Sequence, residues 1–112
     1  NHPDIATTYH SIGLLFLYKG ELTQAEKFLL KALQISQEVL EVNHPDIATT
    51  YHSIGLLFLY KGELTQAEKF LLKALQIRQE VLEVNHPDIA TTYHSIGLLF
   101  LYKGELTQAE KF

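Results

Sequence analysis

The chain has 112 residues, about the size of one domain, of which 46% are apolar and 20% charged, as in soluble globular proteins. Its mild net charge of −4 without a basic stripe argues against a nucleic-acid partner, and the absence of cysteine excludes disulfides and thiolate chemistry. The longest apolar run, residues 12–18, is too short to span a membrane, and no signal peptide opens the sequence, so we expect a cytoplasmic protein.

The dominant feature of the sequence is a repeat with a period of 42 residues. Copies of one segment begin at Asn1, Asn43 and Asn85, and each reads Asn-His-Pro-Asp-Ile-Ala-Thr-Thr-Tyr-His. Residues 1–42 and 43–84 differ only at Ser36 and Arg78, and residues 85–112 repeat the first 28 positions unchanged. A fixed period of this length indicates a solenoid of stacked units. We therefore divide the chain into repeat 1 (1–42), repeat 2 (43–84) and a partial repeat 3 (85–112).

The first half of each repeat is predicted to form a helix, near residues 3–19 in the first copy. Pro3 suits the first helical position, and Asp4 places negative charge in the first turn. Gly20 follows Lys19 and is expected to end the helix in the left-handed conformation. Apolar residues recur at helical spacing along one face, namely Ile5, Tyr9, Ile12 and Phe16.

The second half of each repeat is predicted to form a longer helix, over residues 23–42. Thr23 and Glu26 have the spacing of a capping box, and Asn43 is expected to cap the exit before Pro45. Gly13 lies inside the first helix, where glycine costs about 1 kcal/mol relative to alanine. A close approach of the two helices would offset that cost, with small residues facing Gly13, and the matching positions are Ala25 and Ala32.

The repeat resembles the tetratricopeptide repeat. The residues that match its signature are, in order, Tyr9, Ile12, Gly13, Phe16, Ala25, Leu29, Ala32 and Pro45. The usual unit has about 34 residues, so this one is longer, and the extra length falls in the second helix. The longer unit looks like the variety found in kinesin light chains and in many bacterial arrays.

The resemblance implies an all-α fold, a right-handed superhelical solenoid of antiparallel helix hairpins, with five full helices and a stub. It also implies a non-catalytic protein–protein interaction scaffold that presents a concave groove to a peptide or protein segment. Chaperone-binding members hold a terminal carboxylate with Lys, Asn and Arg side chains of the first helices. His10, Ser11 and Leu14 stand at the corresponding positions here, so that clamp is absent.

A second stripe on the first helix is the candidate groove surface. It lies about a third of a turn from the packing stripe, so it faces the groove if the packing stripe fills the stack. The candidate peptide-binding residues of the three copies are His10, Leu14, Leu17, Tyr18, His52, Leu56, Leu59, Tyr60, His94, Leu98, Leu101 and Tyr102. In the alternative interpretation, the leucines of this stripe only complete the packing between neighbouring first helices.

Neither a metal site nor an active site is expected from the pattern. His2, His44 and His86 are better explained as residues that start helices than as ligands. Identical side chains on successive helices are about 8–10 Å apart, which is too far to share one ion. His10 and Ser11 point about 100° apart on a helix, so they do not form a nucleophile–base pair. We predict a protein that is not an enzyme and has no cofactor.

Self-association is the alternative function. The third copy stops at Phe112, before the continuation that would cover its first helix, and no polar capping helix is present. The two end surfaces are complementary because the copies are identical, so head-to-tail stacking of chains is expected to be favourable. The near identity of the copies fits either a consensus design or a natural array that duplicated recently, and the single difference, Ser36 against Arg78, resembles drift in the latter.

Overall fold

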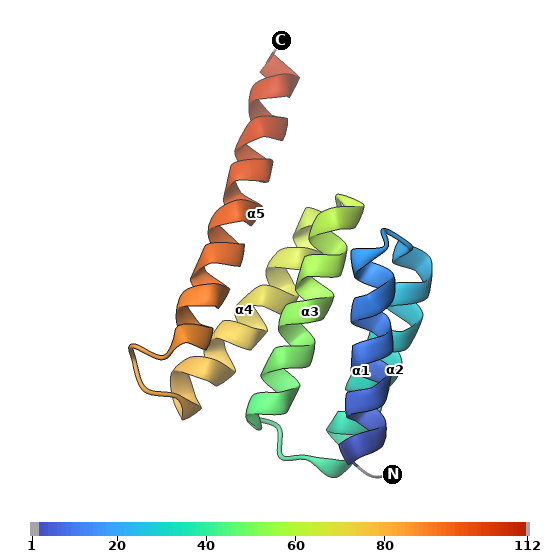
Figure 1. The fold of residues 1–112 in the computed structure, drawn as a ribbon. Helices are drawn as coiled ribbons and strands as arrows, with labels where there is room; N and C mark the ends of the chain where they lie inside the picture. The colour runs from blue at the N-terminus through green and yellow to red at the C-terminus, as the bar shows by residue number, and fades with distance from the viewer. Residues whose placement is uncertain (1–2, 112) are drawn as a thin grey trace.

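The computed structural model describes the backbone of residues 3–111 and the side chains of residues 4–104. Five α-helices follow one another in this part of the chain, and it contains no β-strand. They are α1 (Pro3–Tyr18), α2 (Leu22–Val39), α3 (Pro45–Lys61), α4 (Leu64–Val81) and α5 (Pro87–Lys111) (Figure 1). Among the described residues, no helix is long and apolar enough to cross a membrane.

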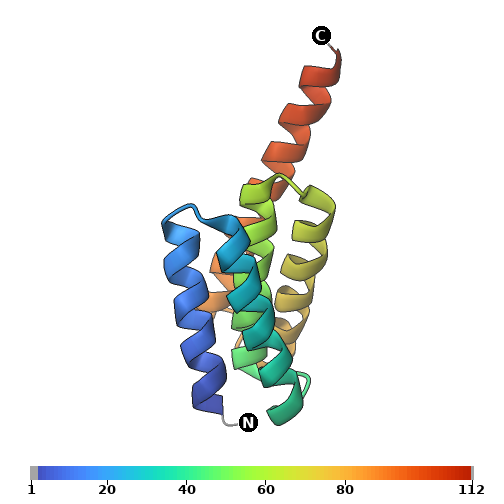
Figure 2. The same cartoon turned by 90° about the vertical axis from the view of Figure 1, so that its right-hand side faces the viewer.

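The helices form two layers. Helices α1 and α2 make one antiparallel hairpin, α3 and α4 make the next, and α5 packs against α4. Figure 2 shows the α1–α2 hairpin in front of α3 and α4. The prediction of an all-α solenoid of stacked helix hairpins is therefore confirmed.

The starts of α3 and α5 have the same geometry, and this geometry explains the His-Pro-Asp segment. His44 precedes α3, and its Nδ1 accepts a hydrogen bond from the backbone N–H of Asp46 at 3.0 Å. His86 accepts the equivalent bond from the N–H of Asp88, also at 3.0 Å. A side chain that accepts from a free N–H in the first turn stabilises the helix start. The interpretation of these histidines as helix-start residues is confirmed for His44 and His86, whereas His2 lies outside the described residues.

The predicted capping box at the second helix is wrong. Helix α2 begins at Leu22, before Thr23, and the side chain of the capping residue Glu21 forms no capping hydrogen bond. The Glu26 side chain instead binds Lys61 Nζ of α3, across the junction between the two repeats. Glu26 is therefore used to join neighbouring hairpins, which a sequence pattern within one helix does not reveal.

Two helix ends also differ from the prediction. Helix α2 ends at Val39 because Leu40 is extended, at φ −118° and ψ 157°, so the chain leaves the helix before residue 42. Gly20 and Gly62 adopt φ 79° and end their helices as predicted. The equivalent Gly104 does not, because α5 continues through it to Lys111. In the first two repeats, by contrast, Leu29 and Leu71 anchor the returning helix against the first one.

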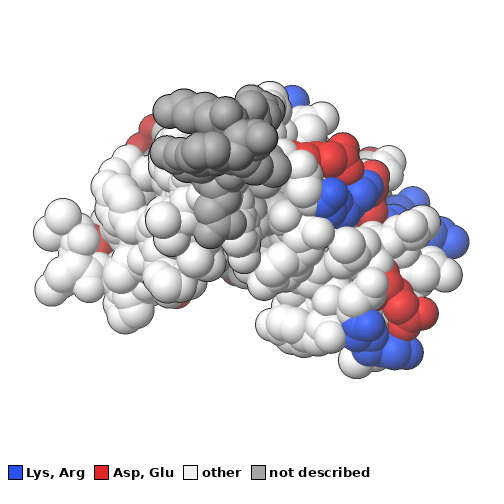
Figure 3. All heavy atoms as spheres, turned by 90° about the horizontal axis from the view of Figure 1, so that it is seen from above, with Lys and Arg blue, Asp and Glu red and all other residues white. Residues whose placement is uncertain are grey.

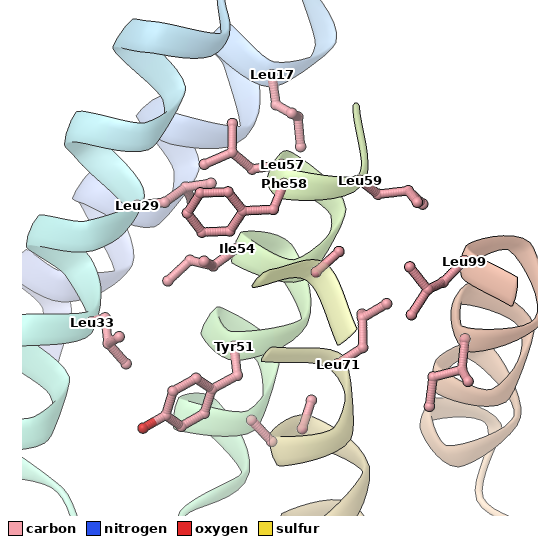
Figure 4. Packing of buried hydrophobic residues seen from close by; sticks show 14 of the residues in the cluster. Leu17, Leu29, Leu33, Tyr51, Ile54, Leu57, Phe58, Leu59, Leu71 and Leu99 are labelled. Atoms are coloured by element: carbon pink, nitrogen blue, oxygen red, sulfur yellow. The ribbon is translucent and has the colours of Figure 1, made fainter. Parts of the chain in front are cut away.

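The core is built around α3, which has neighbours on both sides. The predicted packing face of this helix is buried, and its members are Ile47, Tyr51, Ile54 and Phe58. Phe70 of α4 lies between two of these rings, 6.0 Å from Tyr51 and 5.6 Å from Phe58 between ring centroids. Figure 4 shows Phe58 and Ile54 pointing towards Leu29 of the preceding hairpin. Each fully buried side chain of this size contributes about 1.5–3 kcal/mol.

The glycine inside each first helix permits the close contact within a hairpin, as predicted. A Cβ added to Gly55 would lie 2.7 Å from Cγ and Cδ2 of Leu71 and 3.3 Å from its backbone N. Gly13 has the same relation to Leu29. The residue that faces the glycine is thus a leucine, whereas the sequence favoured Ala25 or Ala32, which are nevertheless fully buried nearby on α2.

We expect Gly55→Ala to destabilise the protein by up to about 2 kcal/mol, because overpacking costs about 1–3 kcal/mol and alanine recovers about 1 kcal/mol of helix propensity. Gly97→Ala is the matched control, because a Cβ there meets nothing within 4 Å. It should leave the free energy of unfolding unchanged or raise it by up to about 1 kcal/mol. Urea unfolding followed by circular dichroism measures both, and equal destabilisation by the two variants would contradict the close contact.

Candidate functional site

Helix α3 has neighbouring helices on both sides, so the face of α3 that stays exposed is the surface that a repeat keeps open within the array. Its Thr49 and Tyr60 are exposed and Leu56 is half-buried, while its other faces are covered. These residues lie at spacings of seven and four, so they share one stripe of the helix. Tyr60 keeps 57% of its surface exposed. The open stripe is therefore a property of the packed array and does not depend on an uncovered end.

The same stripe recurs on the other two first helices. Leu14 and Leu98 are half-buried, and Tyr18 and Tyr102 are exposed at 81% and 42% of their surfaces. Figure 3, a view from above, shows the molecule hollowed along its lower edge, where the surface is uncharged. The charged side chains in that view gather over the turns that follow α1 and α3, where Lys61 pairs with Glu63. The arrangement offers leucine and tyrosine side chains along one uncharged face.

The remaining predicted groove residues of the first two repeats face a neighbouring helix instead. His52 and Leu59 are 8% and 4% exposed, and Figure 4 shows Leu59 on the side of α3 that faces α5. Leu17 is equally buried, at 5%. His10 is half-buried, and its Nε2 lies 2.8 Å from Ser53 Oγ of α3. In these two repeats the histidine and the second leucine therefore join adjacent first helices.

The third repeat shows the same residues without such a neighbour. His94 and Leu101 of α5 are exposed, and Leu101 keeps 63% of its surface open. Their different exposure follows from position in the array, since their sequence context is identical to that of His52 and Leu59. Whether any of the twelve predicted residues binds a partner stays a prediction.

A buried polar cluster lies beside α3, where Arg78 of α4 inserts its guanidinium. Nη1 donates to Thr92 Oγ1 at 2.7 Å, to His52 Nδ1 at 3.1 Å and to the backbone carbonyl of Asp88 at 3.3 Å. Nη2 donates to Thr49 Oγ1 at 3.3 Å. Burial lowers the pKa of the Arg78 guanidinium, and the charge of Asp88 opposes this shift. Four acceptors from two helices, α3 and α5, thus hold one buried cation.

The same cluster determines the tautomer and the protonation state of His52. A guanidinium has no acceptor, so the His52 Nδ1 must accept from Arg78, and Nε2 must then carry the proton and donate to Ser95 Oγ at 2.8 Å. Burial and, next, the charge of Arg78 lower the pKa of His52 to about 4, against a weaker effect of Asp88. His52 is therefore neutral at neutral pH.

Arg78 was not singled out by the sequence patterns as a functional or structural residue. Its only signal was that it replaces Ser36 in two otherwise identical repeats. The described side chains contain no group of three or more His, Asp or Glu residues placed to hold a metal ion. The polar chemistry of the site is therefore that of hydrogen bonds among neutral hydroxyls, imidazoles and one guanidinium.

Residues 4–72 and 54–112 both match the sequence profile described as Tetratricopeptide repeat. The chain belongs to the tetratricopeptide repeat family. Proteins of this family are generally protein–protein interaction scaffolds, and their fold is generally non-catalytic. The resemblance found in the sequence is thereby confirmed over both complete repeats and the partial one.

Solved structures agree with this assignment. BtubC (BKLC) from P. vanneervenii superposes with a TM-score of 0.82 at 23% identity, over 96% of this chain and 43% of that one. A kinesin-light-chain-like protein of Podosopora anserina with nearly identical TPR-like repeats gives 0.75 at 19% identity, over 98% and 52%. The chain thus spans about half the length of these proteins, and the likeness shows the fold alone. No curated protein sequence matches the chain.

We expect the free energy of unfolding to fall as the pH decreases from about 6.5 to about 4. In that window the unfolded chain binds a proton at residue 52 that native His52 does not, so acid favours unfolding. The loss from His52 should be on the order of 2–3 kcal/mol, and denaturant unfolding at each pH measures it. His52→Asn is the control, because it removes this titration, so its stability should depend less on pH. An NMR titration that places the pKa of native His52 near 6.5 would contradict the argument.

Proposed function

We propose that the protein is an interaction scaffold whose open stripe binds a segment of a partner protein. The observation that carries this proposal is the exposure of Tyr60, with half-buried Leu56 beside it, on a helix whose other faces are packed. Large aromatic side chains that remain exposed in a packed array are typical anchors for a partner, because they bury much area with few rotatable bonds. The membership of a family of interaction scaffolds supports the same function.

The spacing of the stripe suggests the form of the partner. Directly packed helices lie about 8–10 Å apart, and we take this as the expected spacing of Tyr18, Tyr60 and Tyr102 along the stripe. A polyproline II segment rises about 3.1 Å per residue and brings every third side chain to the same face, a repeat of about 9 Å. The residues that form the stripe on α3, namely Thr49, Leu56 and Tyr60, are all uncharged. We therefore favour an extended segment with an apolar side chain at every third position.

Selection from a displayed library of random peptides tests the proposal. The selected peptides should lose about tenfold in affinity on Tyr60→Ala, since removal of an interface aromatic typically costs more than 1 kcal/mol. Leu72→Ala is the matched control, because Leu72 is a comparably exposed apolar residue of the same repeat, at 44%, and lies on α4. Isothermal titration calorimetry gives the affinities. Peptides that bind equally well to both variants would sink the proposal.

Head-to-tail self-association is a second candidate, supported by residues at the two ends of the array. Leu15 of α1 is 57% exposed, whereas its counterpart Leu57 in α3 is fully buried. On α5, Tyr93 and Phe100 are each about half exposed, whereas the equivalent Tyr51 and Phe58 are buried. The α1 face has the composition of a repeat junction and the α5 face that of a hairpin interior, so burying this apolar surface against a second copy would be favourable.

Light scattering over a concentration series tests this candidate. The mean molar mass should rise with concentration for the unmodified chain, and Leu15→Lys should return it towards that of a monomer because it places a charge in the contact. Leu72→Lys is the control, since Leu72 is exposed within a repeat that has neighbours on both sides. A strictly monomeric unmodified chain, or an equal effect of the two substitutions, would contradict the candidate.

A further inference from the structure

The two junctions between repeats form an internal comparison. The first junction joins α1 and α2 to α3, and the second joins α3 and α4 to α5. Over the helices that build them, the two junctions have the same sequence except that Ser36 of α2 stands where α4 has Arg78. Ser36 against Arg78 is thus the one difference in side chains between the two junctions.

In the second junction, the guanidinium of Arg78 fills the space. It is 4% exposed and is held by the four acceptors described above, which belong to Thr49, His52, Asp88 and Thr92. The acceptors lie on α3 and α5, and Arg78 reaches them from α4. They are two threonine hydroxyls, one imidazole nitrogen and one backbone carbonyl.

In the first junction, the short side chain of Ser36 leaves a cavity of about 160 Å³. A space of this size holds several water molecules, and so it can take a planar group of four heavy atoms with part of its stem. The lining includes the counterpart of every residue that holds Arg78, each 42 positions earlier: Thr7, His10, Asp46 and Thr50.

These counterparts already have the arrangement of the occupied junction. His10 Nε2 lies 2.8 Å from Ser53 Oγ, as His52 Nε2 lies 2.8 Å from Ser95 Oγ, so Nδ1 of His10 corresponds to the atom that accepts from Arg78. Thr50 Oγ1 donates to the Asp46 carbonyl at 3.1 Å, as Thr92 does to Asp88. The first junction thus repeats the acceptor set without the cation that the second junction places in it.

The electrostatics of the cavity suit a cation. None of its lining residues is a lysine or an arginine. Burial lowers the pKa of His10, so the imidazole is a neutral acceptor at neutral pH, and the negative charge of Asp46 acts on the same ring in the opposite direction. The cavity is reached from outside, because Thr7, Asp46 and Thr49 in its lining are exposed.

We propose that the cavity beside Ser36 is a binding site for a guanidinium group, such as that of an arginine side chain. A guanidinium presents five donors in a fixed plane, which matches acceptors placed around it in the way that Arg78 demonstrates, whereas an ammonium is a compact charge without that fork. Thr7 and Thr49 lie on the open stripes of α1 and α3, so an arginine of a partner segment on that face would reach the cavity. The site itself does not depend on the proposed function of the stripe.

The first experiment uses small probes on the whole chain. Nα-acetylarginine amide, followed by NMR, should cause saturable shifts of the amides of Ser36 and Thr50, with one site per chain. Ser36→Arg should weaken this binding at least about tenfold, because it supplies the guanidinium within the chain. Ser36→Ala is the control that keeps the cavity and should keep the binding. Nα-acetyllysine amide should bind at least about tenfold more weakly.

The reciprocal variant creates a second site. Arg78→Ser should open the equivalent cavity, so two probe molecules should bind per chain, and ethylguanidinium should restore part of the thermal stability that the variant loses. The proposal is overturned if no saturable shift appears below the probe concentration that unfolds the chain. It is also overturned if Ser36→Arg binds the probe as the unmodified chain does, or if Arg78→Ser gains no site.

A further pair of probes separates the sources of the guanidinium. A peptide with one arginine among apolar residues is compared with the same peptide carrying citrulline, which is neutral. In one outcome, the arginine peptide binds more tightly than Nα-acetylarginine amide, and Tyr60→Ala removes this gain in affinity and nothing more. In that case the site receives a partner's arginine on the open stripe. If the two arginine probes bind equally, the site takes small guanidinium compounds, and the function proposed for the stripe fails separately.

Discussion

The structure depends on the contact between the first and second helix of each hairpin, at Gly13 with Leu29 and at Gly55 with Leu71. Without a Cβ on the glycine, the leucine packs against the backbone of the first helix, and both of these leucines are fully buried. This approach places Phe70 between the rings of Tyr51 and Phe58, and it determines which faces of the hairpin are left for the neighbouring hairpin. The spacing within a hairpin thus governs the stacking between hairpins.

The stacking then decides the environment of residues that are identical in sequence. Leu57 is fully buried and Leu15 is mostly exposed, although the two have the same neighbours along the chain. Likewise, His52 is buried against Ser95 while His94 is exposed. In a solenoid each repeat contacts only the adjacent repeats, so position in the array replaces sequence as the determinant of burial.

The two polar junctions show how one substitution acts on such an array. Arg78 converts a cavity that is continuous with the surface into a closed cluster in which every guanidinium bond ends on a neutral acceptor. It also contributes to keeping His52 neutral. A difference that resembles drift in the sequence therefore separates a filled junction from an open one, and the open one faces the same side as the exposed tyrosines of the first helices.

The sequence by itself determined the repeat, the helices, their left-handed glycine ends at Gly20 and Gly62, and the buried face that includes Ile54 and Phe58. These follow from local chemistry and from a periodicity that is visible along the chain. Only the tertiary structure decided that His52 and Leu59 are buried while Leu56 and Tyr60 stay open. All four lie within about a third of a turn on one apolar side of the helix, so the crossing of neighbouring helices selects among them. The tertiary structure also decided which residues bind Glu26 and Arg78, because those binding partners lie on other helices.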